Sequence, residues 1–202
     1  MKRFLLLFAL CIFCTGLSEA QTKKVLDLPK YSFGVRAGFL TQNIQSAYEL
    51  VGGNADNFMG CHVGGTFEVA MNSTRRWFFQ TGVDFQYQTS EGAYGNNHLL
   101  FMEIPVMFAP KFCVGKNVTL YPSFGLSYTV GLWGKLVSKY GDVDAFDISD
   151  FIYNIDRHGA NLRLGVNTTF KNFYLGVGVR LPIGLRLMNP EWSCNITLGY
   201  NF

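Results

Sequence analysis

Apolar and polar residues alternate along much of this chain, in short segments that are separated by turn-forming residues. The segment 173–187 shows this pattern over its whole length, with Phe, Leu, Val or Ile at odd positions and Tyr, Gly, Arg or Pro at even positions. A period of two is the signature of a β-strand with one apolar and one polar face. Turn signals divide the chain into eight such strands, at 31–40, 59–70, 77–88, 99–110, 118–132, 160–170, 173–187 and 192–202.

Charged residues within these strands all fall on the polar face once the apolar residues set the phase. They are Arg36, Glu68, Asp84, Glu103, Arg163, Arg180 and Arg186. Many glycines share this face, where small side chains suit a narrow interior. A Lys or Arg at mid-bilayer on the lipid side of a barrel costs about 2–4 kcal/mol, so a lipid-facing apolar side would require this segregation. The pattern predicts an all-β fold, an eight-stranded antiparallel transmembrane β-barrel with its charges in the lumen.

These interior charges should pair with one another, because a charge that is buried alone is very costly. An eight-stranded barrel is just wide enough for side chains to fill. We therefore expect an ion-paired plug rather than an open channel.

The two ends of the chain carry signals of export. Lys2 and Arg3 precede a short apolar run at 4–13, and Ser18-Glu19-Ala20 resembles a cleavage site. This predicts a signal peptide at 1–20 and a barrel domain at 21–202. A final strand that ends on Phe202, behind an export signal, is typical of bacterial outer-membrane barrels, so we expect that location.

Loop lengths predict how the barrel is oriented. The connections 71–76, 111–117 and 171–172 are short. On the opposite side 41–58, 89–98 and 133–159 are longer, and only the last, 188–191, is short. Short turns usually face the periplasm and longer loops the outside. Because long loops on a rigid scaffold commonly carry binding, 41–58 and 133–159 are the expected contact points for envelope proteins.

Composition agrees with a barrel and excludes one class of partner. Aromatic residues make up 16% of the chain, charged residues only 15%, and there are 22 glycines. The formal net charge of +3 comes without a basic block, so we expect no nucleic-acid partner. Outer-membrane lipid is the expected surrounding, and no signal specifies an oligomeric state.

Candidate chemistry outside the lumen is weak. Two groups of residues contain side chains that can bind metal. They are three histidines expected near the outer rim (His62, His98, His158) and four acids in the third long loop (Asp142, Asp144, Asp147, Asp150). Neither group has the spacing of a known metal site. Two Ser–His neighbourhoods, Ser90 and Glu91 with His98 and Ser149 with His158, match no hydrolase motif. We predict no catalytic residue, cofactor or metal.

Three segments resemble a known family. Residues 101–108, Phe-Met-Glu-Ile-Pro-Val-Met-Phe, resemble the "LEIP" strand of a large family of small bacterial outer-membrane barrels that includes PorT-like proteins. Residues 172–180 with 184–185 resemble that family's penultimate strand, and 146–150 its acidic approach to the sixth strand. The resemblance implies an eight-stranded outer-membrane barrel and, for some PorT-like members, a part in type IX protein secretion. It implies no catalytic residue.

The sequence therefore favours a non-enzymatic outer-membrane barrel with a structural or interaction role. A PorT-like component of type IX secretion is the more specific hypothesis. Two alternatives remain open at this point, an outer-membrane lipid-modifying enzyme and a soluble periplasmic calyx that binds an apolar ligand.

Overall fold

The computed structural model describes residues 28–44, 56–92, 95–114, 117–138, 141–146, 157–183 and 192–202. The predicted signal peptide at 1–20 and the predicted lumen residue Arg186 lie outside these ranges. No helix in the described part of the chain is long and apolar enough to cross a membrane.

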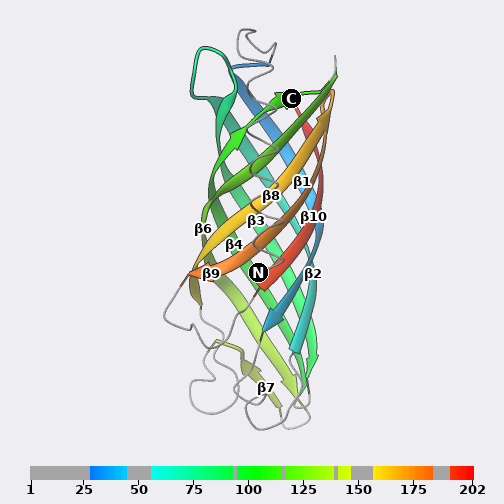
Figure 1. Ribbon diagram of the computed structural model, residues 1–202. Coiled ribbons are helices and arrows are strands. Elements are labelled where there is room, and N and C mark those ends of the chain that lie inside the picture. Colours follow the sequence, from blue (N-terminus) through cyan, green and yellow to red (C-terminus); the bar gives the residue numbers. More distant parts are fainter. Residues whose placement is uncertain are drawn as a thin grey trace, which may run out of the picture.

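Eight long strands form one closed antiparallel sheet, which confirms the predicted fold class (Figure 1). They are β1 (Tyr31–Ile44), β2 (Asp56–Ala70), β3 (Trp77–Gly92), β4 (Gly95–Pro110), β6 (Val118–Ser138), β8 (His158–Phe170), β9 (Phe173–Ile183) and β10 (Trp192–Asn201). The first and last strands pair with each other, and β4 pairs with β6, so the sheet has no open edge between them. Closure satisfies the backbone hydrogen bonds that hydrocarbon cannot. Two short strands, β5 (Phe112–Cys113) and β7 (Gly141–Asp144), pair only with β6.

The outer wall of the barrel is apolar and the lumen is polar. Outward side chains such as Phe39 and Leu198 are 78% and 62% exposed, whereas the inward Glu103 is 1% exposed. Val118 and Leu126, which set the phase in the sequence, also lie on the exposed wall. Such a continuous exposed apolar band is what lipid tails cover. A soluble calyx would have its apolar residues inside, so that alternative is excluded.

The predicted loop at 89–98 is wrong, because β3 runs to Gly92 and β4 begins at Gly95. The sequence here lacks an apolar face, and it therefore looks like a loop. Its inward residues are nevertheless buried, and the Asn97 side-chain amide donates to Ser90 Oγ over 3.1 Å. Backbone pairing thus continues where the hydrophobic pattern has ended. Likewise, β1 and β2 extend into the predicted loop 41–58.

Strand β6 continues beyond its predicted end at 132. The alternation of apolar and polar residues stops at 132 because a β-bulge lies there. Leu100 of β4 pairs with Trp133, but the next residue, Phe101, pairs with Gly131, which leaves Leu132 as the extra residue. Leu132 and Trp133 are consecutive in the chain, and both are exposed on the outer wall. The bulge changes the parity, so a pattern of strict alternation ends at this point. The first part of the predicted loop 133–159 is consequently the β6–β7 hairpin.

Apolar clusters lie at both ends of the lumen. One, at the β7 end, consists of Phe58, Leu99, Phe101 and Ala145, with Phe146 packed against it. The other, at the opposite end, consists of Phe78, Ala109 and Tyr121, with Leu28, Ala70 and Tyr174 packed against it. The polar part of the lumen lies between these two clusters.

Candidate functional site: the polar lumen

Glu103 of β4 is the centre of one buried ion-pair group. Its Oε1 lies 3.5 Å from Arg163 Nη1 of β8, and its Oε2 lies 3.3 Å from Arg180 Nη1 of β9. The amide of Gln86 on β3 also donates to Oε2. Arg180 is further held by Gln86 Oε1, over 2.8 Å, and by Gln42 Oε1 of β1, over 2.9 Å. One carboxylate and its partners therefore link five strands across the lumen.

Glu68 of β2 has a separate partner, Lys111, which the sequence prediction missed. The Lys111 ammonium donates to Glu68 Oε2, and the Gln80 amide donates to Oε1. The ammonium also lies 4.2 Å from the ring centre of Phe78 and 4.8 Å from that of Tyr121. The sequence pattern places Lys111 in the short connection 111–117. Lys111 lies two positions after the inward-facing Ala109, so the period of two along the strand is the signal that could have placed its side chain inside.

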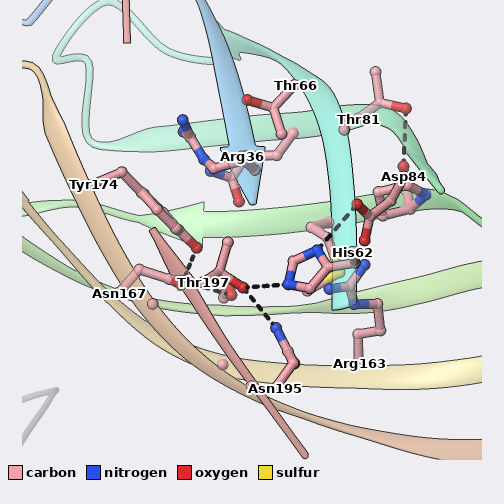
Figure 2. Close-up of a pocket in the computed structure, with 18 of the residues that line it drawn as sticks. Arg36, His62, Thr66, Thr81, Asp84, Arg163, Asn167, Tyr174, Asn195 and Thr197 are labelled. Atoms are coloured by element: carbon pink, nitrogen blue, oxygen red, sulfur yellow. Dashed lines mark hydrogen bonds and ion pairs between the residues drawn. The ribbon is translucent and has the colours of Figure 1, made fainter. Parts of the chain in front are cut away.

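Asp84 of β3 pairs with His62 of β2, in a third group (Figure 2). Asp84 Oδ1 lies 3.1 Å from His62 Nδ1, and His62 Nε2 lies 3.1 Å from Thr197 Oγ1 on β10. Asn195 Nδ2 donates to the same Thr197 oxygen over 2.8 Å. His62 is 6% exposed, so its expected position near the outer rim is wrong. The physical reason is strand parity, since residue 62 faces the same way as Glu68.

Arg36 of β1 has only neutral partners among the described residues. Its Nη2 donates to Asn201 Oδ1 over 2.6 Å, and its Nη1 donates to the carbonyl oxygens of Val35 and Tyr200 over 3.1 and 3.3 Å. The guanidinium carbon lies 3.9 Å from the centre of the Tyr174 ring. An aromatic face stabilises a desolvated cation, but it does not neutralise the charge.

A cavity of about 100 Å³ lies between these groups. It has room for several water molecules, and polar groups that could hydrogen-bond them line it. Figure 2 shows Arg36 and Tyr174 on one side of it and His62, Asp84 and Arg163 on the other. A second space, beside Glu103 and Arg180, measures only about 10 Å³.

The six predicted lumen charges that are described thus occupy the interior, but they do not form a single network. Glu103 meets Arg163 and Arg180 directly. Glu68 and Asp84 pair with residues that the prediction had not included, and Arg36 has no carboxylate partner in the described structure.

The other candidate residues do not come together. His98 and His158 lie on the outer wall, where their Nδ1 atoms share hydrogen bonds of 2.7 and 3.0 Å with Tyr87 and Tyr128. They are therefore separated by the sheet from His62 in the lumen. Across the described ranges no three His, Cys, Asp or Glu side chains are grouped as metal ligands would be.

The acids of the third predicted loop form surface ion pairs instead. Asp142 lies 2.6 Å from Lys135, and Asp144 lies 3.5 Å from Arg157. Asp147, Asp150 and Ser149 lie outside the described residues.

No family model matches this chain, and no curated protein matches it either. Among solved structures, it is similar to Neisserial surface protein A, with a TM-score of 0.50 at 14% identity over 84% of this chain and 95% of that one. Two others are Ail of Yersinia pestis (TM-score 0.43, 16% identity, 86% and 100% covered) and the outer membrane enzyme PagL (0.47, 14%, 83% and 98%). At these identities the likeness concerns the fold. A closed eight-stranded barrel with an apolar outer wall is an outer-membrane structure, and this protein is a β-barrel of the bacterial outer membrane.

Proposed function

We propose that the protein is a non-enzymatic outer-membrane barrel with a closed lumen, which serves a structural or interaction role. The observation that supports a closed lumen is the Glu103 group, in which side chains from five strands meet across the interior. The apolar clusters on either side of the polar lumen add two further barriers.

Recordings from planar lipid bilayers test this proposal. The purified protein should give no stable conductance steps, because ions would have to displace buried ion pairs and aromatic side chains. A matched variant, Arg180→Ala, removes one of the spanning side chains and should be the more permeable of the two. Stable, large steps from the unaltered protein would overturn the closed-lumen proposal.

The interaction role would be carried by the β7 end of the barrel, which includes the described parts of the predicted loops 41–58 and 133–159; residues 45–55, 139–140 and 147–156 of these loops lie outside the described ranges. Affinity capture from the native envelope, with and without the segment 141–146, would identify a partner that depends on this end. If the same proteins were recovered from both samples, the contact would lie elsewhere on the barrel.

A part in type IX secretion is the finer form of this proposal. Its support is the resemblance of 101–108 and 172–180 to PorT-like proteins. A deletion strain should then retain type IX cargo inside the cell and secrete it again when the gene is restored. Normal secretion by the deletion strain would remove this hypothesis and leave the structural role intact.

A hydrolytic enzyme is a second candidate, because Thr197, His62 and Asp84 are hydrogen-bonded in the order hydroxyl, imidazole, carboxylate. That order is the one used by hydrolytic triads. Here, however, the three side chains are enclosed in the lumen, whereas lipid substrates contact the outer wall. Mass spectrometry of lipid A from cells with the native protein or with Thr197→Val would decide the lipid-modifying case. A product that is present only with the native protein would establish the enzyme.

A further inference from the structure

The charged groups that face the larger lumen cavity are not balanced. The cavity is lined by two guanidinium groups, Arg36 and Arg163, and by one carboxylate, Asp84, which is already paired with His62. The other carboxylate near Arg163 is Glu103, and it is shared with Arg180. The cavity therefore has positive charge in excess of its anions.

The excess is concentrated at Arg36. This side chain is buried, and its hydrogen-bond acceptors in the described structure are an amide oxygen and two backbone carbonyl oxygens. These dipoles and the Tyr174 ring orient toward the cation, but they carry no opposing formal charge. Removing an ion from water is costly unless an opposite charge is close, so a mobile counter-ion gains free energy by entering this space.

The cavity has the size and the lining that a small anion needs. Its volume of about 100 Å³ exceeds the space that a single water requires. Besides the two guanidinium groups, its wall contains the side-chain amide of Asn195, which donates one hydrogen bond to Thr197 and has a second N–H to donate. Fixed donors of this kind, in surroundings of low dielectric, favour a desolvated anion.

We infer that the lumen cavity between Arg36 and Arg163 binds a small monovalent inorganic anion of the halide class, as a resident counter-ion. The anion neutralises Arg36 and is enclosed between the two apolar clusters. This site goes beyond the closed-barrel proposal, since a barrel can be closed to conduction whether or not an anion occupies its lumen.

Thermal unfolding of the purified barrel in neutral detergent tests the site, at one pH and one ionic strength. Sodium chloride or bromide is titrated against sodium gluconate, whose anion is too large for the cavity. The unfolding midpoint should rise with chloride and with bromide, and the rise should saturate as the site fills, because a ligand that binds only the folded state stabilises it. A rise that does not saturate, or one that gluconate reproduces, would overturn the inference.

Two variants locate the effect. Arg36→Met removes the charge and keeps an unbranched side chain, and it should lose the saturable part of the shift. Lys135→Gln removes an exposed cation that is paired with Asp142 on the outer surface, and it should retain the full shift. If Arg36→Met kept the shift as well, the halide would not be bound at this position.

If Arg36→Met does not fold, crystals of the native protein grown in bromide provide the direct measurement. An anomalous peak within the cavity supports the site. Bromide-grown crystals whose cavity lacks such a peak contradict it, whatever the behaviour of the variants.

Discussion

Replacing Glu103 by alanine removes the only carboxylate that Arg163 and Arg180 contact in the described structure. Arg180 would keep its bonds to Gln86 and Gln42, whereas Arg163 would keep no ion pair. Glu103 is almost fully buried, and the space beside it is only about 10 Å³, so little water surrounds this carboxylate in the native protein. Removing one partner of a buried pair costs about 3–5 kcal/mol, and we expect a loss in this range.

Urea unfolding in lipid vesicles, followed by tryptophan fluorescence, measures this loss as a change in the free energy of unfolding. Asp142→Ala is the matched control, because Asp142 forms an ion pair of 2.6 Å with Lys135 in which both side chains are more than two-fifths exposed. That pair should contribute about 0–1 kcal/mol. If Glu103→Ala cost no more than Asp142→Ala, the lumen would be hydrated well enough to screen its charges, and the reasoning for a closed interior would be wrong.

Three further substitutions test other parts of the structure. Lys111→Ala leaves the carboxylate of Glu68 buried without its cation and should cost about 3–5 kcal/mol in the same unfolding assay; an unchanged stability would show that Gln80 alone is sufficient. Gly64→Ala should impair folding, seen as loss of heat-modifiable migration on SDS gels, because a Cβ there would lie 2.4 Å from a backbone oxygen of β3, whereas Gly65→Ala meets no atom within 4 Å and should fold normally. Leu126→Arg places a cation on the lipid side and should cost about 2–4 kcal/mol in vesicles, and a neutral result would contradict the assignment of the outer wall.

The faces of the strands could be predicted from the sequence, because inward and outward positions alternate without interruption over most of each strand. Leu126 and Arg180 were placed correctly by this rule alone. The rule failed where a strand has no apolar face, as at 89–98, and where a bulge reverses the parity, as at Leu132.

The pairing of the lumen charges could not be predicted, because it depends on strand register and on side chains that meet across the barrel. Arg180 contacts Gln86, which lies 94 positions earlier in the chain and on a strand that is not its neighbour in the sheet. Lys111 and His62 could have been included from parity, but no local pattern indicates that Glu68 and Asp84 are their partners.

Strand β6 is longer than a membrane crossing requires. A tilted strand crosses a bilayer in about 9–11 residues, whereas β6 has 21 residues and its neighbour β4 has 16. On β6, Trp133 has the character of an interfacial aromatic, and the ion pair of Lys135 with Asp142 follows directly after it. The tip of β6 and its hairpin with β7 therefore extend beyond the lipid headgroups. A large molecule that approached the membrane along β6 would touch this hairpin before it reached the lipid.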